Sequence, residues 1–249
     1  MFRLIVSGLL NLVWPLRTQC LLCREPLPDT PGAALVCAPC LAGMGFPVGV
    51  RRCANCTRPV ETDEGLCADC EHGSPFGVVF ALGAHENSLR EAVHHLKFGD
   101  RDELGPLLGA RLAGRITVSH DCVVPVPLHR SRLRERGYNQ AALIARAIGA
   151  GKAIPVYETG LVRTRRTGHQ AKLQRGNRLH NLQGAFAISP GTAPPWAGRR
   201  VLLVDDVLTT GATAAAAAEI LYHSGARSVD LAVLAVSTTP VRGKLKTCH

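Results

Sequence analysis

A run of four apolar residues followed by two acids limits the fold of this chain more than any other segment. Residues 201–213 have the sequence V-L-L-V-D-D-V-L-T-T-G-A-T, and an alanine run follows them. Residues 201–204 are apolar at every position, which is typical of a strand in a parallel sheet that is covered on both faces. The Thr-Thr-Gly turn and the alanine run predict a loop and then a helix. The segment therefore favours an α/β fold built on a parallel sheet.

The acids and the loop also predict a binding site. Asp205 and Asp206 follow the predicted strand at its carboxyl end, where open α/β sheets bind ligands. Backbone N–H groups and hydroxyls at the start of a helix favour phosphate, and the residues that supply them are Thr209, Thr210, Gly211, Ala212 and Thr213. Because carboxylates repel phosphate, the combination indicates a sugar phosphate whose ribose hydroxyls bind the acids, directly or through a metal. The alternative, a capped helix after a strand with two solvated acids, leaves the acid pair and the turn unexplained.

Eight of the ten cysteines form four Cys-x-x-Cys pairs in the first 70 residues. Two pairs complete a tetrahedral shell of four sulfurs for Zn²⁺, and a shell closed by four protein ligands is structural rather than catalytic. The sequential arrangement predicts two zinc sites, made of Cys20, Cys23, Cys37 and Cys40 and of Cys53, Cys56, Cys67 and Cys70. The spacing also permits an interleaved pairing. Redox pairs are a further alternative, but that chemistry does not need four copies.

The apolar residues 1–14 predict a short amphipathic helix. They carry one positive charge, are not followed by a small-residue cleavage site, and are too few to span a bilayer. We therefore expect a cytoplasmic protein with no membrane span. In that reducing compartment, paired cysteines bind metal rather than form disulfides.

The positive charge of the chain is concentrated in one segment. Residues 129–180 contain twelve Lys and Arg and two Asp and Glu, whereas residues 1–76 contain six and seven. Of the 29 basic residues, 24 are Arg, the side chain suited to bidentate phosphate contacts. The segment predicts a polyanionic partner, either a diphosphate or a nucleic acid. A solvated basic face is the alternative.

Strand and helix patterns alternate from residue 76 onward. We expect strands at residues 76–84, 122–126, 185–188, 201–204 and 229–236, and helices at residues 87–98, 102–114, 133–148 and 212–224. This alternation predicts an α/β domain with a parallel sheet over residues 76–249. The N-terminal helix and a small double zinc ribbon are expected to occupy residues 1–75.

Two segments are candidates for contact with a diphosphate. Residues 123–128, V-V-P-V-P-L, predict a strand ending in a proline-flanked turn that aims backbone N–H groups at a second anion. Residues 163–182 form a long polar loop rich in Arg, Gln and Asn, which suits a lid over a diphosphate. The candidate diphosphate and lid residues are His129, Arg130, Arg134, Arg136, Arg163, Arg165 and Arg166. For the first four, the alternative is a helix start with solvated side chains.

Residues 201–213 resemble the phosphoribosyl diphosphate (PRPP) motif of type I phosphoribosyltransferases. With further segments, the chain resembles the ComF family, the competence-protein-F group of double zinc ribbon and phosphoribosyltransferase-like proteins. The matching segments are the four cysteine pairs, L-K-F at 96–98, V-P-V-P-L-H at 124–129, R-G-Y-N-Q at 136–140, R-T-R-R-T-G-H-Q at 163–170, R-G-N-R-L-H-N-L-Q-G-A-F at 175–186, and the loop at 205–213. They cover nearly the whole chain from Cys20 onward, in order.

The resemblance implies a type I phosphoribosyltransferase fold and Mg²⁺-dependent PRPP binding at Asp205, Asp206 and the loop that follows. It also implies a role in natural transformation, in which incoming single-stranded DNA is handled together with a helicase-like partner. It leaves the reaction open. In the enzyme hypothesis, stabilisation of an oxocarbenium-like transition state supplies the rate, and no nucleophile is required. The alternatives are an active phosphoribosyltransferase of nucleotide metabolism, a DNA-binding module that uses the same anion sites, and a PRPP-sensing regulator without turnover.

Overall fold

The computed structural model describes residues 19–27, 35–60, 65–71, 73–99, 101–165, 184–191 and 193–238. The helix expected in residues 1–14, the lid residue Arg166 and most of the expected lid lie outside these residues. Contacts within the chain divide it into two units, Met1–Gly43 and Met44–His249. Among the described helices, none has the length and hydropathy that a bilayer span requires.

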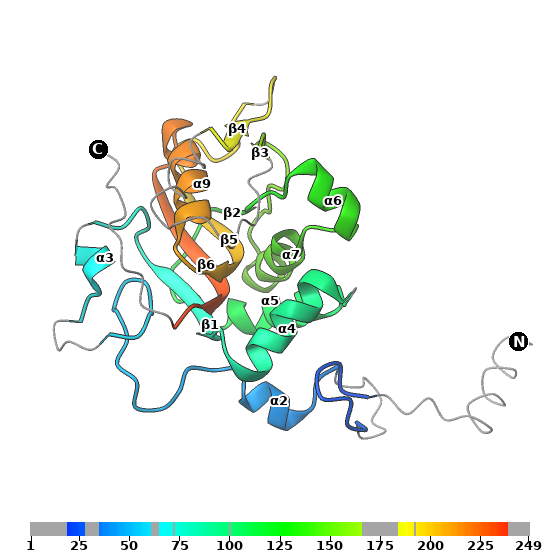
Figure 1. The fold of residues 1–249 in the computed structure, drawn as a ribbon. Coiled ribbons are helices and arrows are strands. Elements are labelled where there is room, and N and C mark those ends of the chain that lie inside the picture. The colour runs from blue at the N-terminus through cyan, green and yellow to red at the C-terminus, as the bar shows by residue number, and fades with distance from the viewer. Residues whose placement is uncertain are drawn as a thin grey trace, which may run out of the picture. The chain divides into compact units, whose positions relative to one another are not determined.

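Four parallel strands form the centre of the larger unit, in the order β1-β6-β5-β2 (Figure 1). Their bounds are Val79–Ala84 for β1, Cys122–Pro125 for β2, Arg200–Leu208 for β5 and Ser228–Val236 for β6. All residues of β1 and β2 are buried, because a parallel sheet is covered on both faces. The parallel α/β sheet predicted from the sequence is thereby confirmed. A separate antiparallel pair joins β3, Leu161–Arg163, to β4, Phe186–Ile188.

Helices cover both faces of the sheet (Figure 1). One face carries α4, α5 and α7, and the other carries α9. Gly109 lets α5 and α7 approach closely, because a Cβ at this position would lie 2.7 Å from the Cβ of Ala147. The helices of this unit are α3 (Ala68–Glu71), α4 (Asn87–Phe98), α5 (Leu104–Ala113), α6 (Arg130–Arg136), α7 (Gln140–Lys152) and α9 (Ala212–His223).

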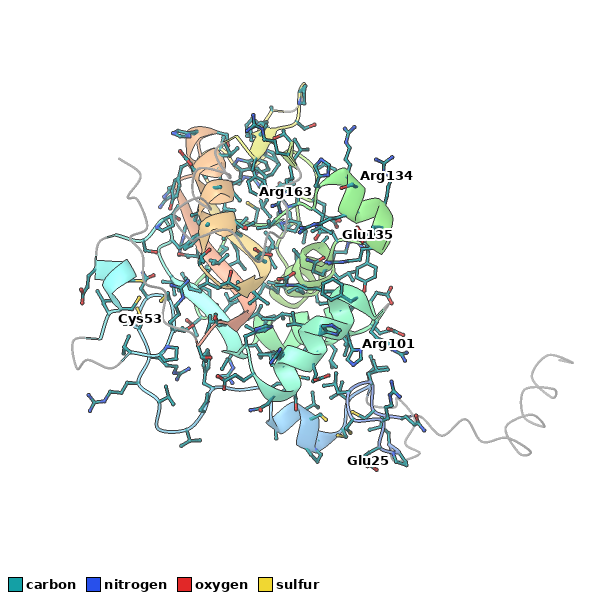
Figure 2. All side chains as sticks on the ribbon, viewed as in Figure 1. Glu25, Cys53, Arg101, Arg134, Glu135 and Arg163 are labelled. Carbon is teal, nitrogen blue, oxygen red and sulfur yellow. The ribbon has the colours of Figure 1, made fainter. Side chains whose placement is uncertain are left out.

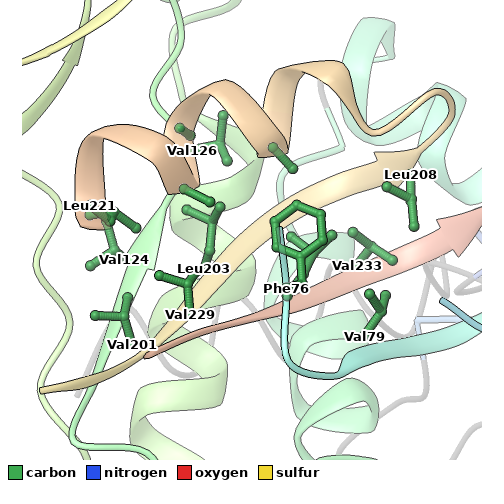
Figure 3. Packing of buried hydrophobic residues seen from close by; sticks show 14 of the residues in the cluster. Phe76, Val79, Val124, Val126, Val201, Leu203, Leu208, Leu221, Val229 and Val233 are labelled. Carbon is green, nitrogen blue, oxygen red and sulfur yellow. The ribbon is translucent and has the colours of Figure 1, made fainter. Parts of the chain in front are cut away.

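An apolar core fills the space between the sheet and α9 (Figure 3). Val201 and Leu203 of β5, Val233 of β6 and Leu221 of α9 all belong to this core. Trp196 is fully buried in the same cluster, and its indole Nε1–H donates to the Ser224 hydroxyl at 2.8 Å. The core holds the central strands rigidly, so the ends of these strands are fixed points for a site.

The strand expected at residues 201–204 is longer than the sequence predicted. β5 continues to Leu208 because β6 supplies ladder partners along its whole length, with Asp205 opposite Val233 and Val207 opposite Ala235. Both acids therefore lie within the strand rather than after it. Since successive residues of a strand point to opposite faces, the two carboxylates leave the sheet in opposite directions.

The single helix expected at residues 133–148 is wrong, because two helices occupy this segment. Gly137 ends α6 in the left-handed region, at φ 81°, and its N–H donates to the Leu133 carbonyl. Asn139 then caps α7, and its side-chain oxygen accepts a hydrogen bond from Ala141 N at 3.1 Å. Hydrophobic periodicity continues across the break, which is why the pattern alone predicted one helix.

The eight paired cysteines form two clusters, and the pairing is sequential. The sulfurs of Cys20, Cys23, Cys37 and Cys40 lie within 4.8 Å of one another, and so do those of Cys53, Cys56, Cys67 and Cys70. Each cluster joins a hairpin turn to a short helix, namely α2 (Ala38–Ala42) in the smaller unit and α3 in the larger.

The geometry of both clusters fits zinc. The Sγ–Sγ distance is 3.6 Å between Cys23 and Cys37 and 3.5 Å between Cys56 and Cys67. A tetrahedral zinc site with Zn–S bonds of about 2.3 Å has S–S edges of about 3.8 Å. Within the second cluster, the hydrogen bond with Cys70 lowers the pKa of the Cys56 thiol to about 5, whereas burial raises the pKa of Cys67 to about 11. These are two structural zinc-binding sites with four sulfur ligands each.

The second cluster belongs to the same unit as the sheet. Cys53 and Cys56 are buried in the core cluster that also contains Phe76 and Val79. The side-chain amide of Asn55 donates to the Gly77 carbonyl at 2.9 Å, and the backbone carbonyl of Asn55 accepts from Val79 N at 3.1 Å. The boundary predicted between residues 75 and 76 stays a prediction about independent folding, whereas the contacts divide the chain after Gly43.

We expect two zinc ions per chain and a coupling between zinc and the stability of the sheet. Chelation should lower the unfolding temperature by about 10 °C, because it removes metal-dependent folding energy from a cluster packed into the core. The fluorescence of the buried Trp196, in a Trp14→Phe background, reports unfolding of this core, and elemental analysis gives the stoichiometry. One zinc or none per folded chain would contradict the two sites.

Candidate functional site

The carboxyl ends of the parallel strands meet at one edge of the sheet, and the predicted acids and loop lie there. Asp205 and Asp206 occupy the last part of β5, and residues 209–211 connect this strand to α9. β1 ends at the same edge, on the far side of β6, and the N–H of His85, just after β1, donates to the Val236 carbonyl at 2.8 Å. This edge is where open α/β sheets bind ligands.

The loop before α9 has the features of an anion site. Gly211 adopts φ 81° and takes the N-cap position, so no side chain caps this helix. The Thr210 hydroxyl accepts from Ala212 N at 3.4 Å, and Thr209 is exposed. A helix start capped by glycine leaves its first N–H groups and the positive end of its dipole to a bound anion.

Asp206 is engaged on both carboxylate oxygens. The Nζ of Lys97, from α4, lies 2.6 Å from Oδ1, and Nε2 of Gln140, from α7, donates to Oδ2 at 2.5 Å. Arg136 in turn donates to Oε1 of Gln140 at 2.5 Å. Asp206 is 6% exposed, and a buried carboxylate requires such partners to remain charged.

Asp205 has a different environment. It is partly exposed, and its Oδ1 accepts a hydrogen bond from Asp206 N at 2.8 Å. Burial and the charge of Asp206 raise the pKa of Asp205 to about 7, although Lys97 and Arg163 act in the opposite direction. The sequence predicted the same role for both acids, but only Asp206 is held by a lysine and a glutamine.

The residues predicted to bind a diphosphate lie in different surroundings. His129 caps α6, since its Nδ1 accepts from Ser131 N at 3.2 Å. Arg130 and Arg134 are exposed on α6, and Figure 2 shows Arg134 projecting outward from this helix. Arg136 lies with its guanidinium carbon 5.3 Å from the centre of the Phe98 ring.

Arg163 lies closer to the acids than the arginines of α6 that point outward. Its guanidinium stacks on Phe186 at 5.3 Å, and burial together with the charge of Arg132 lowers its pKa, while Asp205 raises it. Arg163 therefore interacts electrostatically with both Arg132 and Asp205. Arg165 is exposed at the end of the described segment, and Arg166 lies outside the described residues.

Sequence reasoning missed four residues that contribute to this edge. Lys97 and Gln140 stand in the segments 96–98 and 136–140, which were noted only for their resemblance. Arg58, from the second cysteine cluster, donates through Nη2 to the Thr209 carbonyl at 2.6 Å. Burial and the charges of Lys97 and Arg90 lower the pKa of His85, which favours its neutral imidazole. The signal available for Lys97 and Gln140 was that a buried acid needs a cation and a donor.

Comparison with known proteins matches two family models. The double zinc ribbon domain matches residues 9–71, and the phosphoribosyl transferase domain matches residues 136–247. Competence protein F of Haemophilus influenzae is 35% identical over 113 residues, 45% of this chain and 48% of that protein. The DNA utilization protein YhgH of Escherichia coli K12 is 30% identical over 202 residues, 72% of this chain and 87% of that protein. The chain belongs to the ComF family.

The two family models separate the cysteine clusters of this ComF-family chain from the acids and the loop. The ribbon model contains all eight cluster cysteines, and the transferase model contains both acids, the loop and Gln140. Lys97 lies between the two models. Among solved structures, the chain is similar to a glutamine PRPP amidotransferase from B. subtilis, with 22% identity and a TM-score of 0.39, over 57% of this chain and 30% of that chain.

Loss of the lysine partner should destabilise the fold through Asp206. Lys97→Met leaves a buried carboxylate unpaired, and we expect a loss of about 3 kcal/mol in the free energy of unfolding. Adding Asp206→Asn should restore at least about 1.5 kcal/mol, because it removes the unpaired charge. Urea unfolding of the four members of this cycle measures the coupling.

Lys152→Met is the matched control for this cycle. Lys152 donates to the Ile116 carbonyl at 2.8 Å and is not paired with Asp206. Its effect should therefore add to that of Asp206→Asn. Additive behaviour of Lys97→Met and Asp206→Asn would show that the pair does not contribute as described.

Proposed function

We propose that this ComF-family protein binds PRPP at the carboxyl edge of its sheet. The observation that carries the proposal is the difference between the two acids. Asp206 is held by Lys97 and Gln140, while Asp205 remains available beside a helix start capped by Gly211. A carboxylate next to an anion loop suits a sugar phosphate better than it suits a bare phosphate.

In this proposal, each part of the ligand has its own contacts. Asp205 accepts hydrogen bonds from ribose hydroxyls, and Asp206 keeps the end of the strand in position. The N–H groups of the first turn of α9 and the hydroxyls of Thr209, Thr210 and Thr213 bind the 5-phosphate. The phosphoribosyl transferase model, which spans both features, supports this division.

The diphosphate is proposed to bind toward Arg163 and the start of α6. Arg163 interacts electrostatically with Asp205, and Arg132 lies within electrostatic reach of Arg163. Mg²⁺ would neutralise charge on the diphosphate, and the carboxylate of Asp205 would hold this ion. A site of this kind stabilises positive charge at the anomeric carbon through placed charges, so transfer requires no nucleophile.

Binding and turnover are separate parts of the proposal. The same contacts serve an active phosphoribosyltransferase of nucleotide metabolism and a PRPP-sensing regulator without turnover. Release of diphosphate from bound PRPP, with and without added nucleobases, separates these two functions. We place the protein in the cytoplasm, where PRPP would be available.

The PRPP proposal is tested by calorimetry with PRPP and Mg²⁺. Asp205→Asn should lower the affinity about 30-fold, because it removes a charge-assisted hydrogen bond of about 2 kcal/mol. Because the pKa of Asp205 is raised to about 7 and the ligand complex favours its charged form, affinity should rise from pH 6 to pH 8. Asp205→Asn should remove this dependence.

Asp121→Asn is the control, because it makes the same chemical change as Asp205→Asn but at the amino-terminal edge of the sheet. Asp121 lies before β2, and its Oδ2 accepts from Arg200 N at 2.7 Å. Its replacement should leave PRPP affinity unchanged. If the wild-type protein does not bind PRPP at millimolar concentration, the proposed site is wrong.

A second proposed function is the binding of single-stranded DNA. Phe98, at the end of α4, is 65% exposed, with the His94 ring 5.2 Å and the Arg136 guanidinium 5.3 Å from it. An exposed aromatic ring beside a cation is a platform on which a base can stack. Arg130 and Arg134 on α6 add exposed positive charge. The names of two relatives, DNA utilization protein and Competence protein F, support a role in DNA uptake. The helicase-like partner that the family resemblance implies is part of the same proposal.

The DNA proposal separates stacking from charge. Phe98→Ala should weaken single-strand affinity about tenfold and leave its salt dependence unchanged, whereas Phe98→Trp should retain affinity. Arg130→Gln with Arg134→Gln should lower the slope of log affinity against log salt by about 1.4. Fluorescence anisotropy at several salt concentrations measures both effects.

Arg227→Gln is the charge control for this experiment, since Arg227 is an exposed arginine just before β6, at the opposite edge. It should change neither quantity. Affinity that does not vary with salt, or that is equal in all variants, would contradict DNA binding at this surface.

A further inference from the structure

The second cysteine cluster reaches the phosphate loop through one side chain. Arg58 follows Cys56 by two residues, and its Nη2 donates to the carbonyl oxygen of Thr209 at 2.6 Å. The two residues are 151 positions apart in the sequence. Arg58 is only 6% exposed, so this contact lies inside the protein. A hydrogen bond from a buried guanidinium to a carbonyl is strong and holds its acceptor in one position.

Arg58 is itself fixed by the turn that carries the metal ligands. Its carbonyl accepts from Cys53 N at 2.8 Å, and Thr57 N donates to the Cys53 carbonyl at 2.9 Å. Thr57 adopts φ 60°, a left-handed conformation that a non-glycine residue keeps only where its surroundings enforce it. The direction in which the Arg58 side chain leaves the backbone therefore depends on the closed shape of the cysteine turn.

The guanidinium also borders the place where an anion is proposed to bind. A Cβ built on Gly211 would lie 3.8 Å from Nη2 of Arg58. Gly211 is the N-cap of α9, at φ 81°. The guanidinium is therefore beside the helix start, and its charge has the same sign as that end of the helix dipole.

We infer that Arg58 is a positioning residue for the phosphate loop, and that the second zinc site, through Arg58, sets the affinity of this loop for a ribose 5-phosphate group. The first zinc site has no part in this coupling. The ligand half of the inference rests on the proposed PRPP function, whereas the ordering of the loop does not. Zinc at Cys53, Cys56, Cys67 and Cys70 holds the turn, the turn holds Arg58, and Arg58 holds the Thr209 carbonyl.

Hydrogen exchange of the loop tests the ordering without any ligand. In the zinc-loaded protein, Arg58→Gln should accelerate amide exchange in residues 209–213 about tenfold, because one charge-assisted hydrogen bond no longer opposes local opening. Amide exchange should not change in β5 up to residue 204 or in β6 up to residue 233. If Arg58→Gln fails to hold zinc, amide exchange is measured instead in Arg58→Lys, which keeps the charge and the aliphatic stem.

Arg52→Gln is the matched control. Arg52 stands in the same ribbon, and its guanidinium lies over the Phe46 ring at 4.3 Å. The chemical change is identical, but the loop should keep its wild-type exchange. If Arg58→Gln retains two zinc ions and exchanges in residues 209–213 like the wild type, the inference is wrong, whatever the protein binds.

The ligand half is tested with three probes, namely PRPP with Mg²⁺, ribose 5-phosphate and inorganic diphosphate. Arg58→Gln should weaken the first two by a similar factor of about ten and leave diphosphate unchanged, because the diphosphate contacts are proposed elsewhere. A general loss of structure would weaken all three. Equal binding of PRPP by Arg58→Gln and the wild type would overturn the inference and leave the proposed function intact. A wild-type protein that binds none of the probes would remove the proposed function and the ligand half together, while exchange still decides the ordering.

The zinc coupling is tested by removing one site at a time. Cys53→Ser with Cys56→Ser should accelerate loop exchange at least as much as Arg58→Gln does. Cys20→Ser with Cys23→Ser should lose one zinc ion and leave the loop unchanged. Equal effects of the two double variants on residues 209–213 would contradict a coupling specific to the second site.

Discussion

The carboxylate of Asp206 lies inside the protein, and an ion in that place either has partners or loses its charge. Its partners come from two helices, Lys97 near the end of α4 and Gln140 at the start of α7. The Tyr138 hydroxyl adds a link between these helices by donating to the Leu96 carbonyl at 2.8 Å. One buried charge thus ties the end of α4 and the start of α7 to β5.

Opposite surroundings give two neighbouring acids different chemistry. In β5 the pleat sends Asp206 toward α4 and α7 and Asp205 toward the other face. Asp206 gains a lysine, so its charge is compensated. Asp205 gains burial and a negative neighbour, which raise its pKa to about 7. In the proposed function, a cation or hydroxyl-bearing ligand that favours the carboxylate is the partner of Asp205.

Local patterns in the sequence predicted the elements well where the pattern and the structure have the same cause. The helix at residues 87–98 and the buried strands follow directly from apolar periodicity, and the two cysteine clusters follow from spacing. The length of β5 could not be predicted, because the ladder with β6 decides it and not the residues of β5. The break at Gly137 was visible only as a glycine and an asparagine within a continuous helical pattern. A buried acid at residue 206 implied a cation, but no local pattern could identify Lys97, and Arg58 gave no signal at all, since each meets its partner through a contact between distant parts of the chain.

The second cysteine cluster and the sheet share one core, although sequence models describe a ribbon and a transferase as separate modules. A ribbon attached only by a linker could be exchanged between proteins or lost without affecting the sheet. Here the exchange of residues 44–75 would also have to replace what covers Phe76 and Val79, and the side chain that reaches Thr209. Substitutions on the two sides of this contact must therefore be compatible with each other. We expect the second ribbon and the sheet to have been inherited together, with covarying residues across their shared surface.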